Sequence, residues 1–214
     1  MSELFSPYTY VRDPAEIYRQ SFDTVRSEAD LSRLPDDISE IAIRLVHACG
    51  MPEIVDDLHY HPSVVSQGRC ALRSGAPILV DAEMVAAGII RSRLPENNSI
   101  ICTLNDARTP DHAVAIGNTR SAAAVDFWED HLSGAVVVIG NAPTALFRLL
   151  ELLHEGAPMP AAIFGFPVGF IGAAESKQAL IEYGKDLPYM ALAGRRGGSA
   201  IACASINALA GGLS

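Results

Sequence analysis

The N-terminal part of the sequence repeats apolar and polar positions with the period of an α-helix. Residues 15–29 follow an Asp13-Pro14 pair, which supplies an N-cap side chain and a proline for the first turn. Residues 36–49 fit the three-four apolar pattern more closely, and Gly50 is placed to end that helix. We therefore expect an N-terminal helical segment.

From residue 78 onward, short apolar runs alternate with helical patterns. The runs lack the polar alternation of a sheet with one wet face, so both faces should be covered by helices. This pattern predicts an α/β fold with a mostly parallel central sheet flanked by helices, in a single domain over residues 1–214. Ligands are expected beyond the carboxyl ends of the strands. We expect strands at residues 78–80, 100–104, 135–139, 161–166 and 189–192, and helices that begin near Asp81, Thr119, Pro143, Ala173 and Ser199.

Composition and charge exclude several classes of protein. Hydrophobic residues make up 49% of the chain, which is ample for a buried core, and no apolar stretch is long enough to span a bilayer. The formal net charge of −9 argues against nucleic acid and membrane partners, because both attract basic surfaces. A secretory signal is not evident at the N-terminus. We expect a cytoplasmic protein.

The cysteine and histidine spacings do not indicate a metal site. His59 and His61 form a His-x-His pair that can chelate a metal, but no third ligand is evident, so we interpret this segment as a loop. No cysteine pair has metal or redox spacing. We expect reduced thiols at Cys49, Cys70, Cys102 and Cys203.

The cationic residues consist of fourteen arginines and two lysines. A codon bias of the genome explains this ratio without any function. The alternative is a polyanionic ligand, since the planar guanidinium fork matches carboxylates and phosphates. The composition leaves both explanations open.

Three predicted junctions between a strand and a helix resemble each other, at residues 140–144, 166–170 and 194–199. Helix N-termini favour anions, and the last junction adds Arg195 and Arg196. None has the phosphate-binding or dinucleotide-binding glycine pattern. Ordinary strand–helix turns explain these junctions equally well.

His47 is the first candidate for acid–base chemistry. At about 100° per residue, it falls nearly opposite the apolar stripe of its own helix, on the same side as Arg44. It is therefore either a solvated surface histidine or a functional one. A functional histidine needs a cover, which a ligand, another part of the chain or a second subunit could provide.

Two further positions call for an interpretation. Arg120 is placed at a helix start, where the helix dipole disfavours a cation, so a binding role is one explanation. Asp81 directly follows a strand and is interpreted as a helix cap rather than a base. No nucleophile motif of the Gly-x-Ser-x-Gly type is present.

Several of these segments together resemble the precorrin-8X methylmutase family of cobalamin biosynthesis. They follow one another in order through nearly the whole chain, which makes the set more specific than any one member. The matching segments are residues 17–22, 44–51, 78–89, 118–121, 139–145, 166–170 and 194–199.

The resemblance implies an isomerase that moves a methyl group from carbon 11 to carbon 12 of precorrin-8X and so forms hydrogenobyrinic acid. It implies an α/β homodimer with active sites near the subunit interface, and no cofactor or metal. Transient contacts with neighbouring pathway enzymes are a further expectation. The family's catalytic histidine corresponds to His47. The expected substrate-binding residues are Tyr18, Ser21, Arg44, Thr119, Arg120 and Arg195.

We hypothesise that the imidazolium form of His47 protonates a ring nitrogen of the tetrapyrrole, or donates a hydrogen bond to it. Arg44, Arg120 and Arg195 would hold substrate carboxylates. Two alternatives stay open. In the first, the natural substrate is the cobalt-bearing cobalt-precorrin-8. In the second, the protein binds or transfers a tetrapyrrole without converting it.

Overall fold

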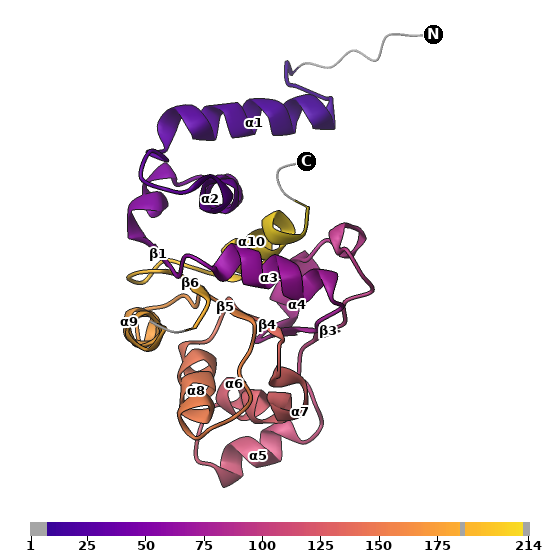
Figure 1. The fold of residues 1–214 in the computed structure, drawn as a ribbon, viewed down its shortest axis with the longest axis vertical. Coiled ribbons are helices and arrows are strands. Elements are labelled where there is room, and N and C mark those ends of the chain that lie inside the picture. Colours follow the sequence, from indigo (N-terminus) through magenta and orange to yellow (C-terminus); the bar gives the residue numbers. More distant parts are fainter. Residues whose placement is uncertain (1–7, 185–186, 212–214) are drawn as a thin grey trace.

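The computed structural model describes residues 8–184 and 187–211, whose arrangement is shown in Figure 1. Two helices come first, α1 (Pro14–Glu28) and α2 (Asp36–Cys49). The Asp13 side chain accepts a hydrogen bond from the Ala15 amide at the start of α1. Gly50 ends α2 with a left-handed φ of +69°. The predicted N-terminal helices are confirmed.

A six-stranded, mostly parallel sheet lies at the centre of the fold, as expected. Its order is β1-β6-β5-β4-β2-β3, and every neighbouring pair is parallel except β1 with β6. The strand order reverses between β2 and β4, and such a reversal opens a crevice at the carboxyl ends of the strands. The strands are β1 (Leu58–Tyr60), β2 (Ile78–Val80), β3 (Ile100–Ile101), β4 (Val136–Ile139), β5 (Ala162–Gly165) and β6 (Tyr189–Leu192).

Helices cover both faces of this sheet (Figure 1). On one face pack α2, α3, α4 and α10, with α1 outside α2, and on the other face pack α6, α7, α8 and α9. Their bounds are α3 (Val64–Arg73), α4 (Glu83–Gly88), α6 (Arg120–Val125), α7 (Glu129–Leu132), α8 (Pro143–His154), α9 (Ala173–Tyr183) and α10 (Ser199–Gly211). The described chain also forms α5 (Thr109–Ala115), which packs on α6, and the short 3-10 helices η1 (Pro52–Asp57), η2 (Arg91–Arg93) and η3 (Asp126–Trp128).

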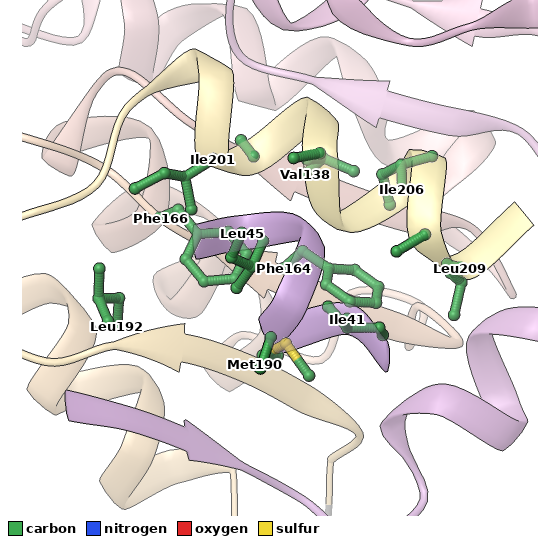
Figure 2. Close-up of a cluster of buried hydrophobic side chains, with 14 of the residues drawn as sticks. Ile41, Leu45, Val138, Phe164, Phe166, Met190, Leu192, Ile201, Ile206 and Leu209 are labelled. Atoms are coloured by element: carbon green, nitrogen blue, oxygen red, sulfur yellow. The ribbon is translucent and has the colours of Figure 1, made fainter. Parts of the chain in front are cut away.

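Successive strand residues belong to two separate hydrophobic cores. Phe164 of β5 lies in the core beneath α2 and α10, together with Ile41, Leu45 and Ile206 (Figure 2). Its neighbour Ile163 belongs to the core beneath α8 and α9. Because helices cover both faces, the central strands are apolar at every position, which is the pattern that the sequence displays.

Three parts of the expected secondary structure are wrong. His59 lies in strand β1, opposite Ala191 of β6, and not in a loop. This edge strand is only partly buried and has a histidine between Leu58 and Tyr60, so it lacks the continuous apolar run of the central strands. His61 follows in a turn, where its Nδ1 is 2.8 Å from Oγ of Ser63. Strand β3 ends at Ile101 instead of residue 104, and helices α3 and α5 were not predicted.

Asp81 follows β2 but does not cap the next helix, whose N-cap is Ala82. Its buried carboxylate accepts hydrogen bonds from the amides of Gly140, Asn141 and Ala142, at 2.8, 2.9 and 2.7 Å. Burial raises the pKa of the Asp81 carboxyl, and these amide bonds oppose the rise. The carboxylate thus binds the turn between β4 and α8 and ties the end of β2 to the end of β4, where the strand order reverses.

Two kinds of feature are absent from the described residues. None of the helices in the described chain has the length and apolar character that a bilayer crossing requires. Within residues 8–184 and 187–211, no three histidine, cysteine, aspartate or glutamate side chains come together as metal ligands.

We predict that Phe164→Ala lowers the free energy of unfolding by about 3–5 kcal/mol, because the fully buried ring leaves a cavity between β5 and the helices above it. Chemical denaturation measures this change. The matched control is Phe170→Ala at a ring that is 85% exposed, which should change stability by less than about 0.5 kcal/mol. Equal effects of the two substitutions would contradict the assigned core.

Candidate active site around His47

His47 lies in the last turn of α2 and is covered by α1. Its Nδ1 is 2.7 Å from Oγ of Ser21. The rings of Tyr18 and Phe22 lie 5.6 and 5.3 Å from the imidazole, between centroids. No group in the described chain is hydrogen-bonded to Nε2 of His47. The imidazole is thus oriented through one ring nitrogen and leaves the other free to meet a ligand.

A hollow of about 370 Å³ opens beside His47, between α1, α2 and α10. Asn207 of α10 fixes one wall, because its Oδ1 accepts from the Ile90 amide at 2.8 Å and its Nδ2 donates to the Gly88 carbonyl at 3.0 Å. The wall mixes apolar and polar groups, as ligand pockets do. Residues that line it include Tyr18, Arg44, His47, Ile90, Cys203 and Asn207.

Arg44 brings a buried positive charge to this hollow. The residue is 4% exposed, and its Nε and Nη2 have no hydrogen-bond acceptor in the described chain. Its Cζ lies 5.3 Å from the centroid of the Phe22 ring. Burial lowers the pKa of the Arg44 guanidinium, and the nearby charge of Arg93 lowers it further. A buried charge without a counter-ion is costly, so this position favours an anionic ligand.

The same charge acts on His47. Burial lowers the pKa of the imidazole below its ordinary value of 6.5, and the positive charge of Arg44 adds to this effect. The surroundings of His47 therefore favour the neutral imidazole. The imidazolium form expected from the sequence requires a change in the surrounding charge.

Four of the sequence-predicted residues come together here, namely Tyr18, Ser21, Arg44 and His47. Ser21 reaches the histidine itself, so its visible role is to orient the imidazole. The sequence left open whether a ligand, another part of the chain or a second subunit covers His47. In the structure, another part of the chain, the helix α1, covers it.

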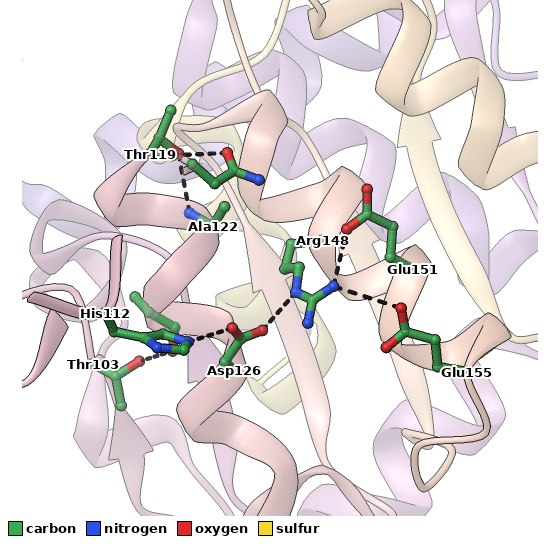
Figure 3. Close-up of polar contacts among 10 residues, drawn as sticks. Thr103, His112, Thr119, Ala122, Asp126, Arg148, Glu151 and Glu155 are labelled. Atoms are coloured by element: carbon green, nitrogen blue, oxygen red, sulfur yellow. Dashed lines mark hydrogen bonds and ion pairs between the residues drawn. The ribbon is translucent and has the colours of Figure 1, made fainter. Parts of the chain in front are cut away.

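Thr119 and Arg120 lie elsewhere, at the start of α6 on the other face of the sheet. Thr119 caps this helix, since its Oγ1 accepts from the Ala122 amide at 3.1 Å (Figure 3). The same Oγ1 is 2.8 Å from Oγ1 of Thr144. Arg120 donates to the Leu104 carbonyl at 3.1 Å, which gives its charge a local partner. Neither residue borders the hollow in the single chain.

A second polar cluster beneath α6 is satisfied internally (Figure 3). Asp126 is 2.6 Å from Nε of Arg148 and 2.5 Å from Nε2 of His112. Arg148 also pairs with Glu151 at 3.1 Å. Each charge faces an opposite charge, so this cluster has no need of a ligand.

Arg195 lies in the loop after β6, where its Cζ is 5.6 Å from the centroid of the exposed Phe170 ring. Buried Lys177 anchors this loop, because its Nζ donates to the Arg196 carbonyl at 2.5 Å. Burial lowers the pKa of Lys177 to about 8. The loop is thus fixed at the carboxyl edge of the sheet, and Arg195 does not border the hollow around His47.

Sequence reasoning missed two residues at this site, Asn207 and Arg93. Asn207 is a polar residue inside the apolar helix α10, and this break in the pattern was a usable signal. Arg93 gave no local signal, because its relation to Arg44 depends on two segments that the fold brings together.

Known proteins match this chain over almost its whole length. A family model described as precorrin-8X methylmutase matches residues 16–211. The precorrin-8X methylmutase of Pseudomonas aeruginosa is 58% identical over 201 residues, which cover 94% of this chain and 97% of the relative. The protein of the same name from a Sinorhizobium species is 56% identical, with 95% and 97% covered.

The fold agrees with these matches. A solved structure of precorrin-8X methylmutase from Thermus thermophilus superimposes with a TM-score of 0.82 at 35% identity, and the match covers 91% of this chain and 94% of the other. The matched part of the chain thus includes both α1, which covers His47, and α10, which forms the far wall of the hollow. The chain belongs to the precorrin-8X methylmutase family, the isomerases of cobalamin biosynthesis.

Proposed function

We propose that this protein converts precorrin-8X to hydrogenobyrinic acid by moving a methyl group from carbon 11 to carbon 12. One observation carries the proposal. His47 is held by Ser21 through Nδ1 and has a free Nε2, beside a hollow that contains the unpaired charge of Arg44. This arrangement supplies a proton at one defined atom and attracts a carboxylate, and the substrate is a tetrapyrrole with acetate and propionate groups.

His47 is the proposed acid. Its protonated imidazole donates from Nε2 to a ring nitrogen near the migrating methyl group, which makes the accepting carbon more electron-poor. Ser21 can support both protonation states, since its hydroxyl donates to the neutral Nδ1 or accepts from Nδ1–H. A positioned acid of this kind contributes about 10²–10⁴ in rate. The rearrangement occurs within one molecule, so the proposal includes no cofactor or metal.

Arg44 is the proposed anchor for a substrate carboxylate, and Tyr18 lies against the same hollow to contact the macrocycle. The hollow is at the small end of the range of about 300–1,000 Å³ that holds drug-sized ligands. A tetrapyrrole therefore extends beyond it. Thr119, Arg120 and Arg195 are the proposed contacts for carboxylates on the remaining part of the substrate.

A second copy of the chain is the proposed cover for the rest of the substrate. Helix α1 packs on α2 and leaves Tyr18, which lines the hollow, 40% exposed and the adjacent Ile17 44% exposed. Exposed apolar residues beside an incomplete pocket are typical of a subunit interface. We propose a homodimer with the active sites near its interface.

Two other functions make different demands on the same site. The cobalt-bearing substrate would occupy it in the same way, but the relatives from Pseudomonas aeruginosa and Sinorhizobium, at 58% and 56% identity, are named for the cobalt-free compound. A carrier without turnover would need no oriented proton donor, whereas Ser21 fixes the His47 ring. We further propose a cytoplasmic location and transient contacts with neighbouring enzymes of the pathway, which would protect an unstable intermediate.

The first prediction is the conversion of precorrin-8X by the native protein in an anaerobic absorbance time course. His47→Ala should lower the rate by at least about 10²-fold and still bind pigment, because it removes the acid and keeps the hollow. His131→Ala, at an exposed histidine of α7, is the matched control and should keep the native rate.

Full turnover by His47→Ala would contradict the acid–base role. Binding without turnover by the native protein, with precorrin-8X and with cobalt-precorrin-8, would contradict the proposed activity and favour the carrier. Turnover of cobalt-precorrin-8 without turnover of precorrin-8X would identify the cobalt-bearing compound as the substrate.

The second prediction concerns pH. Because folding lowers the pKa of His47, the folded protein binds fewer protons at this site than the unfolded chain, and stability falls as the pH drops below about 6.5. Arg44→Met should raise the pKa of His47 and reduce this loss. An NMR titration of the imidazole measures the shift. Arg91→Met, at an exposed arginine, should leave the pKa unchanged, and an equal pKa in all three proteins would contradict the coupling.

The third prediction concerns assembly. Ile17→Asp should weaken the dimer, because it introduces a charge on the exposed side of α1, and sedimentation should then show a lower mass than for the native protein. Val114→Asp, at an 82% exposed position on α5, is the control and should leave the mass unchanged. A native protein that turns over substrate as a monomer would contradict the proposed interface.

A further inference from the structure

We infer that Arg93 forms a two-arginine binding site together with Arg44, and that this site takes one carboxylate of the substrate. The inference rests on the proposed function and adds a specificity residue to it. Arg93 lies on η2, outside the seven sequence segments that resemble the family.

Both Arg44 and Arg93 lack a counter-ion within the described residues. Three buried side-chain nitrogens in the described chain have no hydrogen-bond partner, and they are Nε and Nη2 of Arg44 and Nη1 of Arg93. Other partly buried arginines are paired, for example Arg148 with Asp126 and Arg69 with Glu40, at 2.6 and 2.9 Å. The missing partner is therefore specific to Arg44 and Arg93.

The fold connects Arg93 to the wall of the hollow, although Arg93 is not itself a lining residue. Ile90 lines the hollow, and its amide is held by Oδ1 of Asn207. Its carbonyl accepts a hydrogen bond from the Arg93 amide at 3.0 Å. The side chain of Arg93 lies against the end of α10, since a Cβ added at Gly211 would be 3.3 Å from Cδ of Arg93. The turn that carries Arg93 is thus a rigid extension of the wall that Arg44 faces.

The positive charges of Arg44 and Arg93 repel each other. The charge of Arg93 is close enough to Arg44 to lower the pKa of that guanidinium. Two like charges at a buried position oppose folding unless an anion lies between them. A carboxylate accepts two parallel bonds from one guanidinium and further bonds from a second, which neither arginine alone can provide. Groups that bind ligands are often retained at a cost in stability.

An occupied site would also change the state of His47. The titratable or charged side chains that line the hollow with His47 are Tyr18 of α1, Arg44 of α2 and Cys203 of α10, and the charge of Arg93 acts on Arg44. A carboxylate bound by the two arginines cancels the charge that disfavours the imidazolium. Substrate binding would therefore favour the protonated imidazole of His47, which is the acid in the proposed reaction.

The test compares Arg93→Gln with Arg91→Gln, which removes an exposed charge from the same turn. Arg93→Gln should weaken the binding of hydrogenobyrinic acid, the coloured product, by about 10- to 100-fold in an absorbance titration. It should also raise the melting temperature of the ligand-free protein, because it relieves the repulsion of Arg44. Arg91→Gln should change neither quantity.

Two results would overturn the inference. Native affinity in Arg93→Gln would exclude a contact with the ligand, and a lower melting temperature of the free variant would assign Arg93 a structural role. Turnover of precorrin-8X by the native protein is measured in parallel. If it is absent while the loss of affinity is present, the proposed activity fails and the carboxylate site stands.

Discussion

The packing of α2 determines the rest of the site. Its apolar stripe is buried against α10 and the sheet, and a helix has only one other side on which to place Arg44 and His47. That side faces α1 and the hollow, so the histidine is shielded but reachable, and the arginine is buried without an acid beside it. The helix contributes to the core with one face and to the chemistry with the other.

The protein carries a net charge of −9, and still the described residues offer no hydrogen-bond partner to Nε and Nη2 of Arg44 or to Nη1 of Arg93. At the carboxyl edge of the sheet a buried carboxylate is satisfied within the chain, since Asp81 accepts three amide hydrogen bonds from residues 140–142, just before α8. The hollow beside His47 lies between α1, α2 and α10. There the unpaired arginine nitrogens favour an anion from outside the chain.

The sequence predicts the parts of this structure that depend on local pattern. The apolar runs of the strands, the stripe of α2, the cap at Asp13 and the turn at Gly50 are all readable, because each depends on neighbours along the chain. Strand β1 is a partly buried edge strand with a histidine at its centre, so it lacks the apolar run that identifies β2, and β3 is shorter than its apolar run indicated.

At the site, the face of His47 and its partner Arg44 follow from helical geometry, and the roles of Tyr18 and Ser21 followed from resemblance. The bond from Ser21 to His47, the wall fixed by Asn207 and the approach of Arg93 join segments far apart in the sequence. No period or spacing along a single chain encodes such contacts. The helix cap predicted at Asp81 is wrong, because its carboxylate binds the amides of residues 140–142, which lie far away in the sequence.

The central claim is that a bound carboxylate converts His47 from a neutral imidazole into an acid. An NMR pH titration of His47, with and without hydrogenobyrinic acid, tests it most directly. The account predicts a pKa below 6.5 in the free protein and a higher pKa in the complex. A pKa that is unchanged or lower in the complex would contradict the account.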